Sequence, residues 1–180
     1  MGFLTSQQVN KYYDFFQKAE ITFTKEVIQA MSLNAQQSSI RCVGSEGGPW
    51  LCVINSSSMI GAKVIVPQHC GIYEKICEGS TAISLWFSFS QTNGKSDLSF
   101  FVSGKVVSCT PYTVTPDLLL LNIEYTQRAP DDLIEKLGLL VDAKANTTKR
   151  GDERIELNAE AMRKLSLAKK DTIVYIENIP

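Results

Sequence analysis

The chain has 180 residues, of which 44% are hydrophobic and 21% are charged, so it can bury one domain-sized core plus an appendage. Its 18 Lys and Arg residues nearly balance 19 Asp and Glu residues, and a net charge of -1 gives no basis for general nucleic-acid binding. The sequence lacks both the long apolar run of a membrane-spanning helix and the basic-then-apolar start of an export signal, so we expect a cytoplasmic protein.

Two helices are predicted near the start of the chain. Residues at helical spacing predict the first of them: Val9, Tyr12, Tyr13 and Phe16. Thr5 or Ser6 can cap this helix, and we expect its aromatic stripe to pack against the sheet or a neighbouring chain. A short strand at 21–23 follows, and then a second helix from its cap Thr24 to about Leu33.

The hydrophobic period then changes from 3.6 to 2, which predicts a sheet. The main strands are expected at residues 39–43, 50–54, 62–66, 83–89, 98–109 and 118–125. A polar turn is expected at 55–61 and a loop with one helical turn at 67–79, and a terminal helix begins near Asp131. About six strands with short antiparallel links predict a mainly β fold, a small barrel with flanking helices, because closure removes exposed edges.

The cysteines and the single histidine give little support for metal binding or catalysis. Five cysteines at irregular spacing favour buried thiols over disulfides or metal ligands: Cys42, Cys52, Cys70, Cys77 and Cys109. His69 and Cys70 with Cys77 fit no zinc pattern, and the chain has no second His. No nucleophile context, paired carboxylates or phosphate-cradling glycines are found, so we expect a protein that is not an enzyme and needs no cofactor.

A segment near the end of the chain repeats a segment near its start. Residues 155–167 match residues 21–33 at a constant offset of 134 (155 minus 21), with identical Ile, Glu, Ser and Leu residues at four positions. Strand-like segments follow both copies, which predicts a modular chain. We expect an N-terminal helix at 1–20, a first domain at 21–141, a linker at 142–154 and the start of a second domain at 155–180.

Residues 50–66, with the sequence WLCVINSSSMIGAKVIV, resemble the signature strand-turn-strand of PilZ domains, in which an Asp/Asn-x-Ser-x-x-Gly turn precedes Ala and a β-branched strand. The order of residues 103–107, residues 123–125 and the terminal helix is also similar, so that the resemblance covers about 21–141. It implies a six-stranded antiparallel, split PilZ-like barrel with N-terminal helices and a C-terminal helix. It further implies a bacterial two-domain receptor for the second messenger cyclic di-GMP, with a degenerate first domain.

Two arginines lie between the two copies of the repeat. Arg150 and Arg154 match the Arg-x-x-x-Arg linker motif that grips the nucleotide in the PilZ family, and Lys149 is expected as an additional ligand contact. Guanidinium groups are planar and permanently charged, so they can bind phosphate oxygens or a guanine edge through two hydrogen bonds and can stack on a base. Two arginines at this spacing are also common on solvated surfaces, but the adjacent repeat favours ligand binding.

The first copy of the repeat lacks this chemistry. At the same offset it has Phe16 and Glu20 in place of the two arginines, and a carboxylate repels a phosphate. Its turn has Ser58 at the Ser position but Ser56 at the Asp/Asn position, so we expect this barrel to serve as a scaffold or docking module. The matching turn of the second copy would fall near position 190, beyond Pro180, and we therefore expect weak nucleotide binding by this chain.

The resemblance leaves a second function open, a PilZ-like protein-interaction module that works without nucleotide. Its barrel and aromatic N-terminal helix would dock a protein of a motility or export system. Apolar side chains within 155–180 are also expected to support self-association. For the receptor, the resemblance implies control of motility, polysaccharide production or virulence.

Overall fold

The computed structural model describes residues 5–44, 46–79, 81–91, 97–113, 115 and 117–149, with side chains through residue 144. The chain divides into two units, Met1–Asp142 and Ala143–Pro180, and the described residues of the second unit form the end of a helix. The helices are α1 (Ser6–Phe16), α2 (Lys25–Met31), α3 (Ile72–Cys77) and α4 (Asp131–Lys149). The strands are β1 (Ile21–Thr22), β2 (Ser39–Cys42), β3 (Trp50–Leu51), β4 (Val53–Ser57), β5 (Gly61–Pro67), β6 (Ala82–Phe89), β7 (Leu98–Pro111) and β8 (Leu118–Tyr125).

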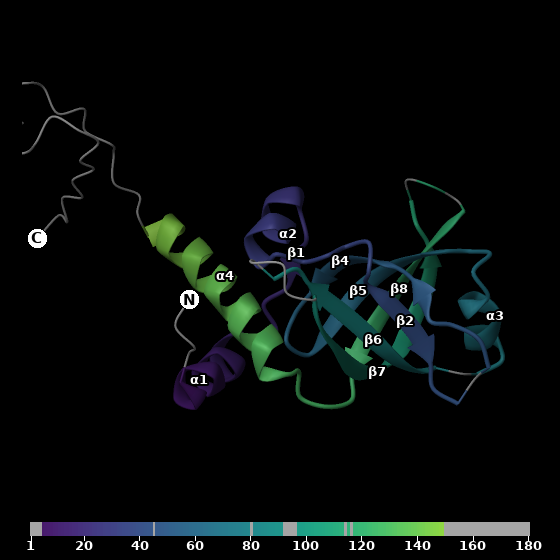
Figure 1. Ribbon diagram of the computed structural model, residues 1–180, viewed down its shortest axis with the longest axis horizontal. Coiled ribbons are helices and arrows are strands. Elements are labelled where there is room, and N and C mark those ends of the chain that lie inside the picture. The colour runs from purple at the N-terminus through teal and green to yellow at the C-terminus, as the bar shows by residue number, and fades with distance from the viewer. Residues whose placement is uncertain are drawn as a thin grey trace, which may run out of the picture. The chain divides into compact units, whose positions relative to one another are not determined.

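The strands form one antiparallel sheet in the order β1-β4-β5-β8-β7-β6-β2-β3 (Figure 1). This arrangement confirms the prediction of a mainly β fold with flanking helices. The predicted number of six strands is wrong, because the described part of the chain contains eight. The short strand β1 pairs with β4 and joins the sheet, and the strand expected at 50–54 divides at Cys52 into β3 and β4.

The division at Cys52 gives one segment of the chain two different neighbours. Before it, β3 pairs with β2, and Trp50 lies opposite Ile40. After it, β4 pairs with β5, and Val53 lies opposite Ile65. Cys52 itself is buried, and its N–H donates a 3.1 Å hydrogen bond to the carbonyl oxygen of Ser38.

The polar turn expected at 55–61 is shorter in the structure, because β4 continues to Ser57. The register of β4 and β5 shifts between Ile54 and Ser56, which marks a β-bulge. Ser56 and Ser57 are buried despite their hydroxyl groups, and both hydroxyls have hydrogen-bond partners. A polar side chain can lie in a buried strand when its hydrogen bonds are made. The chain therefore reverses direction only after Ser57, between β4 and β5.

The core lies on the inner face of the sheet and under the helices. In β5, Ala62, Val64 and Val66 are buried and alternate with half-buried residues, as the period of two predicts. The helices add further buried apolar side chains: Val9, Met31, Leu133, Ile134 and Leu137. The aromatic stripe of α1 packs against this core, as expected, and α1 lies beside α4 (Figure 1).

The caps of the first two helices follow the prediction. Thr5 is the N-cap residue of α1, and its N–H donates a 3.1 Å hydrogen bond to Oε1 of Gln8. Thr24 caps α2, and its hydroxyl accepts a hydrogen bond from the N–H of Val27. The helical turn expected within 67–79 is also present, as α3.

The five thiols differ in exposure. Cys42 and Cys52 are buried, as predicted, and burial raises the pKa of Cys52 to about 12. Cys70 and Cys109 are only half-buried, and the prediction of burial is wrong for Cys77, which is exposed at the end of α3. None of the helices in the described part of the chain is both long and apolar enough to cross a bilayer.

Candidate functional site

The structure describes only the beginning of the predicted arginine linker. Helix α4 continues to Lys149, so the first eight residues of the linker expected at 142–154 are helical. The backbone of Lys149 ends this helix, and its side chain is not among those described. Arg150, Arg154 and the second domain expected at 155–180 lie outside the described residues.

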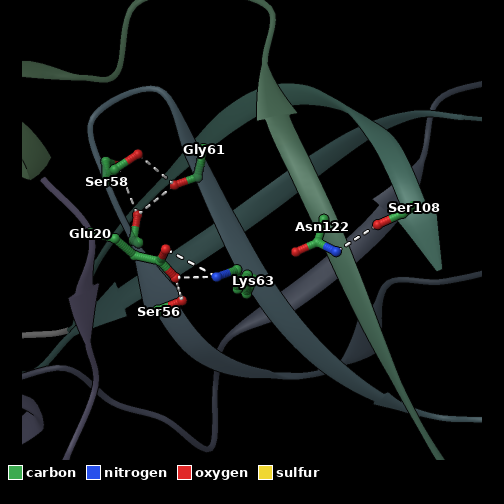
Figure 2. A network of polar contacts seen from close by, with 8 residues as sticks. Glu20, Ser56, Ser58, Gly61, Lys63, Ser108 and Asn122 are labelled. Carbon is green, nitrogen blue, oxygen red and sulfur yellow. Dashed lines mark hydrogen bonds and ion pairs between the residues drawn. The ribbon is translucent and has the colours of Figure 1, made fainter. Parts of the chain in front are cut away.

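The first copy of the motif is fully described, and the structure brings its parts together. Glu20, which takes the place of the second arginine, lies beside the turn that follows β4 (Figure 2). Its Oε1 atom accepts a short hydrogen bond from the hydroxyl of Ser56, the residue at the Asp/Asn position. Lys63 of β5 donates a 3.0 Å hydrogen bond to Oε2 and lies 2.8 Å from Oε1. Phe16, which takes the place of the first arginine, packs against the core.

These partners keep Glu20 ionised. The hydrogen bond from Lys63 is the largest cause of the lowered pKa of Glu20, and the hydrogen bond from Ser56 acts in the same direction against a smaller effect of burial. The side chains of Glu20 and Lys63 are 45% and 42% exposed, so solvent weakens the attraction between them. Both charges remain accessible from solvent. The position that carries an arginine in the binding motif thus carries a partnered negative charge here.

The hydroxyl groups of the turn also serve the fold. The hydroxyl groups of Ser57 and Tyr125 share a 2.9 Å hydrogen bond. Burial raises the pKa of Tyr125 well above its ordinary value. Ser58 Oγ accepts a hydrogen bond from the N–H of Ile60, and its own hydroxyl donates to the carbonyl oxygen of Gly61. The serines therefore stabilise the turn and connect it to β8.

Gly61 is required at the end of this turn because β8 approaches it closely. A Cβ atom at this position would lie 2.6 Å from the backbone carbonyl oxygen of Ile123, a distance that real Cβ atoms essentially never show. The close approach follows from the pairing of β5 with β8, in which Gly61 lies opposite Glu124. The glycine of the turn is thus explained by packing, without any ligand.

A depression of about 200 Å³ lies over this network. Its lining combines two lysines, one carboxylate, small polar residues and a few apolar ones: Lys18, Glu20, Ser57, Ser58, Ile60, Gly61, Ala62, Lys63, Asn122 and Ile123. At its edge, the amide of Asn122 donates a hydrogen bond to the hydroxyl of Ser108 on the neighbouring strand β7 (Figure 2). None of the described residues that line the depression is an arginine.

Comparison with known proteins identifies the family. The sequence matches the PilZN3 domain over residues 7–144, which is most of the chain. The chain belongs to the PilZN3 domain family. This membership confirms the predicted resemblance to PilZ domains.

The names of two proteins similar to this PilZN3 protein mention the nucleotide cyclic di-GMP. A protein of Treponema denticola named "Cyclic di-GMP binding protein" is 44% identical over 181 residues, which cover all of this chain and 57% of the relative. The crystal structure of the Borreliella burgdorferi PlzA protein in complex with c-di-GMP is 24% identical, with a TM-score of 0.62, and shows the same fold. That alignment covers 89% of this chain and 65% of PlzA, so the chain spans about three-fifths of the length of these relatives.

Sequence reasoning missed Lys63 as a partner of Glu20 in this PilZN3 domain. Lys63 is separated from Glu20 by 43 positions, and the two side chains meet only because β4 lies between β1 and β5 in the sheet. The sequence does contain one signal for the lysine. Lys63 alternates with the buried residues of β5, so its side chain lies on the opposite face of the strand. A charged side chain on that face is either solvated or paired with an opposite charge.

Proposed function

We propose that this chain is part of a cyclic di-GMP receptor in which Arg150 and Arg154 bind the nucleotide and Lys149 adds a contact. The observation that carries the proposal is the relative from Treponema denticola, which is named for cyclic di-GMP binding and aligns with the whole chain. The arginine pair supplies the chemistry that such a ligand needs. Planar cations can form two hydrogen bonds with a phosphate or a guanine edge and can stack on a base.

The proposed domain organisation places a scaffold barrel before the binding linker. The helix at 1–20 and the barrel at 21–141 precede the linker at 142–154, and a second PilZ domain starts at 155. Closure of the barrel is supported by β3 and β4, which are separated by Cys52 alone and connect β2 with β5. Ligand binding at the linker would alter how the receptor meets a protein partner, for which the resemblance suggests a motility or export component.

The negative charge of Glu20 favours placing the nucleotide at the linker instead of in the depression. A phosphate entering the depression would meet the carboxylate of Glu20 and would compete with it for Lys63. Lysine supplies charge but neither the planar fork nor the stacking surface of arginine. The first barrel is therefore proposed as a scaffold, and the paired arginines as the ligand site.

Titration calorimetry with cyclic di-GMP tests this assignment in a chain extended through the proposed second domain, because weak binding is expected of residues 1–180 alone. Arg150→Ala and Arg154→Ala should each weaken binding about 10- to 100-fold, because each removes charge-assisted hydrogen bonds worth roughly 1.5–3 kcal/mol. Arg163→Ala is the matched control, since it removes a guanidinium from the second copy outside the motif, and it should bind like the wild type. Wild-type affinity in both motif variants would overturn the site, and no binding by the wild type would favour the nucleotide-independent interaction module.

A further inference from the structure

Helices α1 and α4 are in close contact at Gly138. A Cβ atom on this glycine would lie 2.5 Å from Cγ and 2.9 Å from Cβ of Tyr12, and closer still to the ring atom Cδ2. Glycine weakens the interior of a helix relative to alanine, so α4 gives up helix stability at this position. The ring of Tyr12 occupies the space that a side chain at position 138 would fill.

One helical turn later, the same tyrosine forms a polar contact with α4. The hydroxyl of Tyr12 donates a 3.2 Å hydrogen bond to Oδ2 of Asp142, and the contact is partly buried. Burial and the charge of Asp142 both raise the pKa of this phenol, so it keeps its proton at neutral pH and remains the donor. Tyr12 thus contacts α4 through both its ring and its hydroxyl group.

A second set of contacts holds α1 to the segment just before α4. Arg128 lies over the ring of Tyr13 at 5.1 Å, and its guanidinium donates a 2.8 Å hydrogen bond to Oδ1 of Asn10. Arg128 also pairs with Asp131, the first residue of α4, at 3.3 Å. Helix α1 is therefore attached both at the start of α4 and at Asp142, which is eleven positions further along the chain.

We infer that Tyr12 and Asp142 are positioning residues for the arginine linker, because they restrain the helix that leads directly into it. This inference rests on the proposed function. Helix α4 is continuous from Asp131 to Lys149, and Asp142 lies about two turns before its end. Arg150 is the next residue in the chain. A restrained helix loses less freedom when the linker binds a ligand, so the contact with α1 raises nucleotide affinity through preorganisation.

The substitution Tyr12→Phe tests the inference because it removes the hydroxyl and keeps the ring against Gly138. Titration of the same extended chain with cyclic di-GMP should show roughly threefold to tenfold weaker binding, the effect of one lost hydrogen bond. Amide hydrogen exchange at residues 143–149 should also become faster. Tyr13→Phe is the matched control, since it makes the same change one residue away and keeps the ring under Arg128, and it should leave both measurements unchanged.

Variants of the acceptor separate positioning from general stability. Asp142→Asn retains a carbonyl oxygen for the tyrosine and should bind nucleotide within about twofold of the wild type, whereas Asp142→Ala should match Tyr12→Phe. The inference is overturned if Tyr12→Phe binds like the wild type while Arg150→Ala binds more weakly, and the proposed function then still stands. If instead neither arginine substitution affects binding, the proposed function fails. Unchanged exchange at 143–149 in Tyr12→Phe would then overturn the restraint as well.

Discussion

The substitution Gly138→Ala tests the contact between α1 and α4 through two opposing effects. Alanine favours the interior of a helix over glycine by about 0.5–1 kcal/mol, so helix propensity alone predicts a more stable protein. The new methyl group would lie 2.5 Å from Cγ and 2.9 Å from Cβ of Tyr12. The Cβ atom is fixed by the backbone of α1, so the tyrosine cannot simply rotate away.

The steric effect should outweigh the gain in helix propensity. Overpacking of a well-filled contact typically costs about 1–3 kcal/mol. Subtracting the helix gain leaves a net destabilisation of about 0–2.5 kcal/mol for Gly138→Ala. Contacts of 2.5 Å and 2.9 Å with Tyr12 favour the upper half of that range. Urea unfolding followed by circular dichroism measures this difference in the free energy of unfolding.

The same substitution in a Tyr12→Ala background provides the control. Removing the ring abolishes the contacts with Cγ and Cδ2 and leaves only the 2.9 Å contact with Cβ, which a small shift of α1 can relieve. In that background Gly138→Ala should be neutral or stabilising, by up to about 1 kcal/mol. If Gly138→Ala has the same effect in both backgrounds, Tyr12 does not fill the space beside Gly138 and the reasoning is refuted.

Three further predictions concern the sheet and the thiols. Glu20→Gln should destabilise the protein at pH 7 by at most about 1 kcal/mol, because the ion pair is half-exposed. The pKa of Glu20 is lowered by folding, so its contribution is present above the unfolded pKa and is lost as pH falls through the folded pKa. A difference in unfolding free energy that stays constant into acid would contradict this. Gly61→Ala should lower the urea midpoint by the equivalent of about 1–3 kcal/mol, because its Cβ meets the carbonyl oxygen of Ile123, and an unchanged midpoint would count against that contact. Iodoacetamide at pH 8 should modify the exposed Cys77 well before Cys52, whose pKa of about 12 leaves a thiolate fraction of roughly one in ten thousand. Peptide mass spectrometry measures both rates, and similar rates would show that Cys52 is accessible.

Local periodicity was sufficient to predict most of the fold. A period of two predicted the central strands, and the buried and half-buried residues of β5 alternate as that period requires. Thr24 was predicted as a helix cap, and Thr5 was one of two candidates for the first helix, because the groups that a cap satisfies lie within three or four residues. These features depend on neighbours in the chain, which a single sequence displays directly.

Two features of the sheet that the sequence did not predict depend on distant parts of the chain. The division of the segment around Cys52 into β3 and β4 follows from pairing with β2 on one side and β5 on the other. The extension of β4 through Ser56 and Ser57 depends on partners at Glu20 and Tyr125. Serine and asparagine favour turns when only local preferences are considered, and long-range hydrogen bonds override that preference here.

The same difference between local and distant information applies to the candidate site. The sequence repeat aligned Glu20 with an arginine, and its negative charge led to the prediction that the first barrel does not bind phosphate, which stays a prediction. The sequence did not reveal that this carboxylate is held by Ser56 and Lys63, which are 36 and 43 positions away. Those contacts depend on the strand order β1-β4-β5, which places the three side chains side by side.

The positions of the arginines bear on where a nucleotide could bind. Only two arginines occur among the described residues, Arg41 on β2 and Arg128 before α4. Neither lines the depression over the turn, and Arg128 is engaged by Asn10 and Asp131. A ligand with two phosphodiesters and two guanines favours cations that can form paired hydrogen bonds and stack on a base. The cations among the described lining residues of the depression are two lysines, and Glu20 lies beside one of them. We therefore propose that the arginines after α4, and not this depression, contact the nucleotide.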